Sequence, residues 1–291
     1  MREITVFTHR QPDETSATLR SLVEHAAAAG VRLRLDEDET RKHGLEAGPA
    51  VELNGPPKND VELCIVLGGD GTILRALQHY AGTEVPVFAI NFGVIGFLAT
   101  VEAADGEEGI RRALDGDFEL LRLPAIVLGA PGEPVPERRF ADGVQTAHND
   151  IAIHRKVGER VADVAFALEG EEVGSVRCDG LVVATAAGST GYNLANGGPV
   201  MAWGVAGYVV SFIAPHSLTA RTLVVAPEDA LTIHNRSREP LEIAIDGRPA
   251  GEIPAGGAVE ARFVDDVGTL AQLPGTSFYR RLREKFGRLA S

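Results

Sequence analysis

The feature that most restricts the fold is the stretch Leu63–Leu67, in which all the side chains are apolar. A short strand of this kind is buried on both faces, as in a parallel sheet that helices cover on both sides. Gly68 and Gly69 follow directly, and a helical pattern begins at Thr72. The stretch therefore predicts a strand, a tight turn and a helix inside an open α/β sheet.

Residues 1–123 repeat this alternation of strands and helices. Further strands are expected at Glu3–His9, Val31–Leu35 and Val85–Ile90, and helices at Glu14–Ala29, Thr72–Tyr80 and Ala103–Leu114. The segment Gly44–Asp60 carries Gly, Pro and Asn, which is typical of a loop. We therefore expect an N-terminal α/β domain with an open, mostly parallel sheet.

The pattern changes near Leu123, after which short alternating strands are separated by turn residues. The strands are expected at Ile151–Ile153, Ala162–Leu168, Leu181–Ala184, Tyr208–Ile213, Leu223–Val225, Leu231–His234 and Leu241–Ile245. This spacing predicts a second, β-rich and β-sandwich-like domain over residues 124–266. Residues 267–291 are expected to rejoin the first domain.

The C-terminal segment Ser277–Ala290 has a helical pattern. Its apolar residues share one face of that helix, at Phe278, Leu282, Phe286 and Leu289. We expect this helix to pack back on the first domain. A basic helix that contacts a nucleotide is the alternative.

The overall charge is −13 and the pI is about 5.1, which excludes a general nucleic-acid-binding surface. No apolar run approaches the roughly 20 residues of a membrane span. The N-terminal MREITVFTHR is typical of a strand, not of a signal peptide, so we expect a cytoplasmic protein. Cys64 and Cys178 lie in apolar stretches and are expected to be buried thiols.

Lysine is scarce: it occurs only at Lys42, Lys58, Lys156 and Lys285, and arginine supplies the other basic residues. The stretch Asp36–Thr40 (DEDET) adds to the acidic excess. Two explanations stay open. One is adaptation to high salt, as in a haloarchaeon, and the other is an ordinary acidic protein from a GC-rich genome.

The turn Gly68–Thr72 (GGDGT) lies where a phosphate loop would lie, between a strand and a helix. No Walker A run is present, and the dinucleotide fingerprint fails because its third glycine would fall on Leu74. A carboxylate repels a bare phosphate, so Asp70 suits a hydroxyl that loses its proton, or a metal that carries phosphate. The alternative is that Asp70 only caps the helix.

A second constellation, Asp179–Pro199, contains a loop rich in small residues and hydroxyls. Its amides can approach a polar ligand closely, and Tyr192 adds an aromatic face. An ordinary turn is the alternative. Ser189 is not expected to be a hydrolase nucleophile, because the G-x-S-x-G spacing is absent.

Asn149 and Asp150 directly precede an expected strand, and both side chains can hydrogen-bond ribose hydroxyls. An Asx turn is the alternative. The histidines at His148, His154 and His216 lack the spacing of zinc ligands, so no metal-ligating residues are assigned.

Taken together, four motifs resemble the NAD kinase family in order and spacing: Gly68–Thr72, Asn91–Ala99, Asn149-Asp150 and Asp179–Pro199. GGDGT is shared with lipid kinases and phosphofructokinases, whereas the block Asp179–Pro199 is much more specific. The resemblance implies phosphorylation of the adenosine-ribose 2′-hydroxyl of NAD, with ATP or polyphosphate as donor and a divalent metal ion, expected to be Mg²⁺. It also implies a homodimer or homotetramer.

The resemblance assigns site residues by motif. Asp70 matches the proton acceptor, and Tyr192 matches a position that stacks on a ring of the nucleotide. The other matched binding positions are Gly71, Arg75, Asn149, Asp150, Arg160, Arg177, Asp179, Thr190, Gly191, Asn193, Leu194, Ala195 and Ala214. Arg248 is assigned to a further binding position, where some bacterial members have Gln.

The chain departs from the family pattern at Phe92, Val94, Ala186 and Arg248. These departures leave the donor and the nucleotide preference open, and affect the expected reaction less. The alternatives to an NAD kinase are a lipid kinase that shares GGDGT and a non-catalytic NAD-binding sensor.

Overall fold

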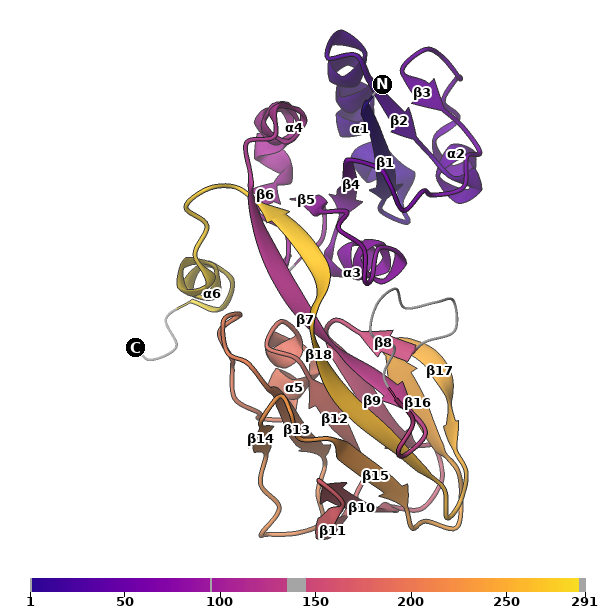
Figure 1. Cartoon of the computed structure of the whole chain (residues 1–291), viewed down its shortest axis with the longest axis vertical. Coiled ribbons are helices and arrows are strands. Elements are labelled where there is room, and N and C mark those ends of the chain that lie inside the picture. The colour runs from indigo at the N-terminus through magenta and orange to yellow at the C-terminus, as the bar shows by residue number, and fades with distance from the viewer. Residues whose placement is uncertain (1, 95, 135–144, 288–291) are drawn as a thin grey trace. The chain divides into compact units, whose positions relative to one another are not determined.

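The computed structural model describes residues 2–94, 96–134 and 145–287. The chain divides into two compact units, Met1–Arg122 with Gly268–Ser291, and Leu123–Val267. Two long strands, β7 (Glu119–Gly129) and β18 (Ala258–Gln272), carry the chain from one unit to the other (Figure 1).

The first unit is built on a parallel sheet. Its strands are β1 (Arg2–Thr8), β2 (Val31–Arg34), β3 (Val51–Glu52), β4 (Leu63–Gly68), β5 (Val87–Asn91) and β6 (Val101–Glu102). The order is β3-β2-β1-β4-β5, and β18 joins β5 in parallel through Leu270 and Ala271. The strand order reverses between β1 and β4, and the carboxyl ends of such strands border the ligand crevice of open α/β sheets.

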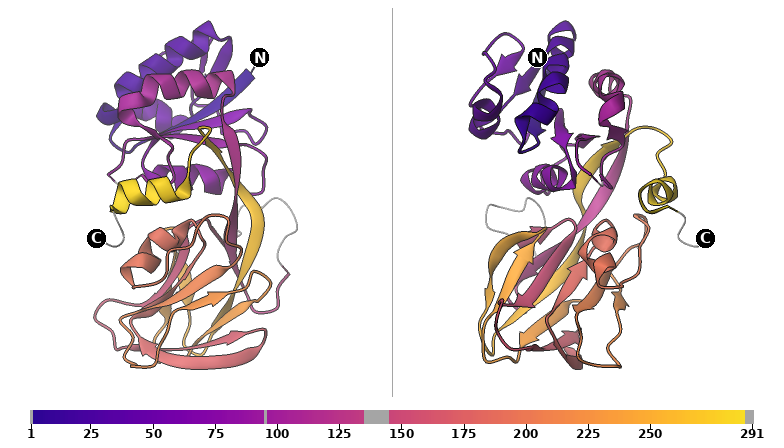
Figure 2. Two further views of the ribbon diagram at one scale, coloured as in Figure 1. Left: turned by 90° about the vertical axis from the view of Figure 1, so that its left-hand side faces the viewer. Right: turned by 180° about the vertical axis from the view of Figure 1, so that it is seen from behind.

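Helices cover both faces of this sheet. They are α1 (Pro12–Ala28), α2 (Glu37–His43), α3 (Asp70–His79), α4 (Gly106–Asp115, preceded by the 3₁₀ turn Ala103–Asp105) and α6 (Phe278–Phe286). Leu22 of α1 and Ile110 of α4 join one apolar cluster with Ile65 of β4. Figure 2 shows α1 and α4 side by side, with α3 across the sheet from them.

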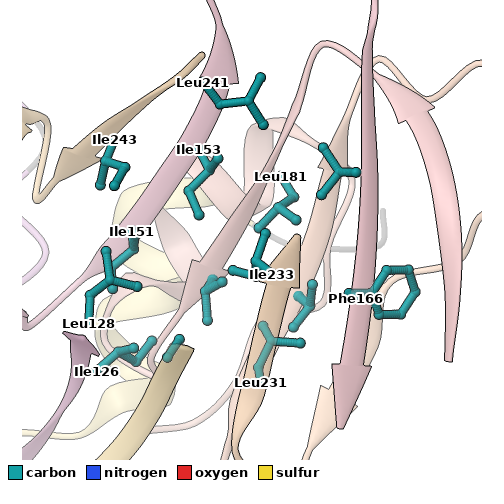
Figure 3. Packing of buried hydrophobic residues seen from close by; sticks show 14 of the residues in the cluster. Ile126, Leu128, Ile151, Ile153, Phe166, Leu181, Leu231, Ile233, Leu241 and Ile243 are labelled. Carbon is teal, nitrogen blue, oxygen red and sulfur yellow. The ribbon is translucent and has the colours of Figure 1, made fainter. Parts of the chain in front are cut away.

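The second unit is a β-sandwich. Its remaining elements are β8 (Gln145–Ala147), β9 (Asp150–Arg155), β10 (Ala162–Leu168), β11 (Glu171–Cys178), β12 (Gly180–Ala184), the 3₁₀ turn η2 (Gly188–Thr190), α5 (Tyr192–Ala195), β13 (Tyr208–Ile213), β14 (Leu223–Val225), β15 (Leu231–Asn235), β16 (Leu241–Ile245) and β17 (Arg248–Ile253). One antiparallel sheet has the order β14-β13-β12-β9-β16-β17, and a second layer runs β11-β10-β15-β18. Figure 3 shows side chains of the two layers meeting in the core, among them Ile153, Leu181 and Ile233.

The expected fold class is confirmed: an α/β unit precedes a β-rich one. The expected C-terminal helix exists as α6, and its Phe278 and Phe286 contact Phe97 of the first unit, while Leu289 lies outside the described residues. None of the helices in the described ranges is long and apolar enough to cross a bilayer.

One expectation about local structure is wrong, and it concerns the segment that follows helix α2. That helix begins after Asp36, whose side chain accepts the backbone N–H of Glu39 and caps the helix. The expected loop Gly44–Asp60 contains the strand β3, which pairs with β2 at the edge of the sheet. The buried thiols are confirmed, since Cys64 and Cys178 are free and buried.

Candidate active site

The GGDGT turn leads directly from β4 into α3. Strand β4 ends at Gly68, Gly69 occupies the N-cap position and the helix begins at Asp70. The half-buried carboxylate of Asp70 accepts the backbone N–H of Phe97 over 2.9 Å and that of Leu98 over 3.0 Å. The helix-capping alternative is therefore wrong, because this side chain binds a neighbouring loop instead of its own helix end.

Two glycines allow that loop to lie against the turn. A Cβ atom built on Gly93 would lie 2.9 Å from the Cα atom of Gly69, closer than real Cβ contacts allow. The backbones of the two loops therefore touch without an intervening side chain. This close approach brings the amides of Phe97 and Leu98 within reach of Asp70.

Arg75 of α3 is already engaged in an ion pair. Its guanidinium lies 2.5 Å from Glu39 of α2, whose side chain is fully buried, and 4.8 Å from the centroid of the Phe7 ring. Glu39 also accepts hydrogen bonds from Thr8 and Lys42. The Arg75 side chain is 29% exposed, so part of it stays accessible to a ligand while it pairs with Glu39. The sequence pattern did not indicate that Glu39 is buried, because Glu39 lies in the acidic stretch Asp36–Thr40, which is typical of an exposed surface.

In the second unit, Asp246 organises the entry to β9. Its carboxylate accepts backbone N–H groups from His148 over 3.0 Å, Asn149 over 2.8 Å and Asp150 over 3.1 Å. The Asx-turn alternative for Asn149 is wrong, because its Oδ1 atom has no hydrogen-bond partner among the described residues. Sequence analysis missed Asp246, although Asp-Gly between two strands is a hairpin signature that points to this turn.

Asp150 and Asp246 form a pair of crowded carboxyl groups. Burial, and then the charge of Asp246, raise the pKa of Asp150 to about 7. Burial also raises the pKa of Asp246, against the opposing effects of His148 and of the three backbone hydrogen bonds. The pair thus places a carboxyl group that titrates near neutrality beside an expected ribose-binding position.

The loop after β12 packs tightly against this strand entry. A Cβ atom on Gly188 would lie 2.0 Å from the carbonyl oxygen of Asn149, so only glycine fits there. The buried Ser189 hydroxyl donates to Ala186 and accepts the N–H of Met201, which gives it a structural role. The buried Asn193 amide donates to the carbonyls of Ser189 and Pro199. These bonds fix the loop that carries Tyr192.

Two adjoining cavities of the second unit contain several of the expected binding residues. The smaller, of about 410 Å³, is lined by Asp150, Asp179 and Tyr192, whose ring is 41% exposed. The larger, of about 780 Å³, is lined by arginines together with Glu159, Asp163 and Glu239; the arginines are Arg155, Arg160, Arg177, Arg236 and Arg238. Arg155 lines both cavities and pairs with Asp179 over 2.6 Å.

The other expected residues are spread over neighbouring elements. Thr190 ends η2, Gly191 follows it, and Leu194 and Ala195 lie on α5. Ala214 follows β13 with a positive φ of 43°, and Arg248 begins β17. Asp70, Gly71 and Arg75 belong to the first unit, whereas all the others belong to the second.

The described side chains offer few grouped donors for a metal ion. Within residues 2–94, 96–134 and 145–287, no three His, Cys, Asp or Glu side chains are grouped so that they could hold an ion. The described residues therefore do not supply a metal cage of their own.

Comparisons with known proteins point to the same family for both parts of the chain. Residues 6–118 match the family model of the ATP-NAD kinase N-terminal domain, and residues 148–265 match that of the ATP-NAD kinase C-terminal domain. An NAD kinase of Lachnoclostridium phytofermentans is 30% identical over 99% of each chain. One of Leifsonia xyli subsp. xyli is 34% identical over 98% of this chain and 94% of that relative.

Solved structures share the fold. Yeast NADH kinase complexed with NADH superimposes with a TM-score of 0.85 at 21% identity, covering 100% of this chain and 89% of that one. An NAD kinase from Archaeoglobus fulgidus in complex with ATP has a TM-score of 0.72 at 26% identity, covering 99% of this chain and 98% of that one.

Proposed function

The chain belongs to the NAD kinase family, and on that premise we propose that it phosphorylates the adenosine-ribose 2′-hydroxyl of NAD, giving NADP. ATP is the proposed donor, because a 26% identical NAD kinase was solved with ATP, and polyphosphate remains a second candidate.

The observation that carries the proposal is the fixed carboxylate of Asp70. A ribose hydroxyl is a poor nucleophile at neutral pH, so its proton must be accepted as the phosphoryl group arrives in line. Each Asp70 oxygen accepts one backbone N–H, which leaves lone pairs free for a hydroxyl. Asp70 is therefore the proposed proton acceptor, with Gly71 beside the nucleotide.

The second unit is proposed to bind the dinucleotide. Tyr192 is exposed enough to stack on a ring, while Asn149 and Asp150 suit ribose hydroxyls. Arg160 and Arg177 line the larger cavity and suit phosphate oxygens. The loop residues Thr190, Gly191, Asn193, Leu194 and Ala195, together with Asp179, Ala214 and Arg248, complete the proposed binding set.

A divalent metal ion, Mg²⁺ as proposed, would enter with the donor as its metal complex. The absence of a grouped ligand set among the described residues fits an ion that the phosphates of the donor bring in. Bound there, the ion would offset negative charge on the transferred phosphoryl group.

The domain boundaries 1–123 with 267–291, and 124–266, also remain our proposal, supported by the division of the chain into two compact units. A homodimer or homotetramer in the cytoplasm is proposed from the family resemblance.

One assay tests the function. The purified protein is incubated with NAD, ATP and Mg²⁺, and NADP is measured with a dehydrogenase that accepts only NADP. Formation of NADP supports the proposal. Product from a lipid and none from NAD would favour the lipid kinase, whereas NAD binding without turnover would favour a sensor. Replacing ATP by polyphosphate identifies the donor.

A further inference from the structure

Arg281 of the C-terminal helix α6 is a buried cation beside the candidate active site. Its side chain is only 7% exposed, and its guanidinium donates to the backbone carbonyl of Phe97. Burial lowers the pKa of Arg281 to about 10, while the negative charges of Asp70, Glu102 and Glu284 act in the opposite direction. The guanidinium therefore remains charged between pH 7 and 8.

The peptide between Phe97 and Leu98 connects this arginine to Asp70. Its N–H, on Leu98, donates to Asp70 over 3.0 Å, and its carbonyl, on Phe97, accepts from Arg281. The Phe97 ring lies 5.8 Å from that of Phe278 and 5.9 Å from that of Phe286, both on α6. One peptide unit thus links the helix to the proposed proton acceptor.

Glu102, one of the charged groups near Arg281, has two other partners. Glu102 of β6 accepts from Lys285 of α6 over 2.6 Å and from Asn91 over 2.8 Å. Burial would raise the pKa of Glu102, but these hydrogen bonds and the charges of Lys285 and Arg281 lower it. Helix α6 is therefore tied to the rest of the first unit at Glu102 as well as at Phe97.

We propose that Arg281 is a positioning residue for the phosphoryl transfer: by holding the Phe97 carbonyl, it fixes the Phe97–Leu98 peptide that binds the Asp70 carboxylate. The inference rests on the proposed function of the site. Arg281 acts through this peptide, without touching a substrate.

The test compares Arg281→Met, Arg281→Lys and the control Arg280→Met. Arg280 is an exposed arginine of the same helix, so its loss removes the same charge from α6 without touching the Phe97 peptide. For Arg281→Met we expect kcat to fall about 10- to 100-fold with KM for NAD nearly unchanged. Arg281→Lys should recover much of kcat, because an ammonium group can still donate to the Phe97 carbonyl, and Arg280→Met should behave as wild type.

A second measurement does not depend on activity. Backbone hydrogen exchange at Phe97 and Leu98 should be at least about tenfold faster in Arg281→Met than in Arg280→Met, because the Phe97 carbonyl loses its donor. Unchanged exchange together with a near wild-type kcat in Arg281→Met would overturn the inference. Failure of both wild type and Arg280→Met to form NADP would instead overturn the proposed function, and this role with it.

Discussion

The backbone N–H of Phe97 points at the carboxylate of Asp70 over 2.9 Å, and that of Leu98 does so over 3.0 Å. The group proposed to accept the ribose proton is therefore also the anchor of a neighbouring loop. In Asp70→Asn, the amide oxygen can still accept one of these N–H groups, but the amide nitrogen cannot accept the other. We expect kcat to fall by roughly 10²–10⁴ and the free energy of unfolding to fall by about 1–3 kcal/mol.

Steady-state kinetics well below the melting temperature, combined with thermal melts, separate these two effects. A folded Asp70→Asn protein with near wild-type turnover would remove the proton-acceptor role.

Replacement of Tyr192 by Ala should weaken NAD binding. The ring is 41% exposed and lines the smaller cavity, so its loss removes a stacking surface and little of the core. Base–aromatic stacking is worth about 1–3 kcal/mol, so we expect KM for NAD to rise about 5- to 100-fold with kcat nearly unchanged. Tyr192→Phe keeps the ring and should stay near wild type. An unchanged KM in Tyr192→Ala would count against stacking.

Asp150→Asn should change how stability depends on pH. The pKa of Asp150 is raised to about 7, from an ordinary value of 3.8, by burial and by Asp246. Because the folded state holds this proton more tightly than the unfolded state, ionisation of Asp150 costs stability as pH rises from about 4 to 7. Asn lacks that cost, so Asp150→Asn should be the more stable protein at pH 8, by an amount of order a few kcal/mol.

Thermal melts of the ligand-free protein at pH 5 and pH 8 measure this effect. The advantage of Asp150→Asn should be large at pH 8 and should shrink toward pH 5. An advantage that is equal at both pH values, or absent, would show that Asp150 titrates outside this window.

Gly188→Ala should damage the proposed nucleotide cavity. The new Cβ atom would lie 2.0 Å from the carbonyl oxygen of Asn149, and neither backbone can yield without moving the Asn149-Asp150 segment. We expect a lower melting temperature and a kcat/KM for NAD reduced by about 100-fold or more, as misplacement of about 1 Å commonly causes. Gly204→Ala is the control, since nothing lies within 4 Å of the equivalent atom. Near wild-type kinetics in Gly188→Ala would contradict the tight packing described here.

Most of the first unit could be predicted from the sequence, because its strands and helices have clear local patterns of apolar residues. Leu63–Leu67 is apolar throughout and became β4, buried at every position. By contrast, β11 and β17 have mostly exposed residues and no apolar run, so they form strands only because a neighbour offers hydrogen bonds. Alternation patterns do not detect strands of that kind.

Motifs in the sequence identified the proposed site residues. No sequence pattern identified the residues that hold these site residues in place. Asp246 binds three successive amides about a hundred residues earlier in the chain, as the separations of 96 to 98 positions show. Arg281 binds a carbonyl 184 positions away. Contacts over such separations leave no periodic trace, and only the folded chain brings their partners together.

The first unit is discontinuous: residues 268–291 return to it after the second unit is complete. During synthesis from the N-terminus, the sandwich can therefore close before β18 reaches β5 and before the α6 rings reach Phe97. A released polypeptide that ended ahead of Gly268 would contain the residues that line the proposed coenzyme cavities but would lack the helix that supports the loop at Asp70. Catalytic competence would thus be acquired last, after the strands that form the pocket.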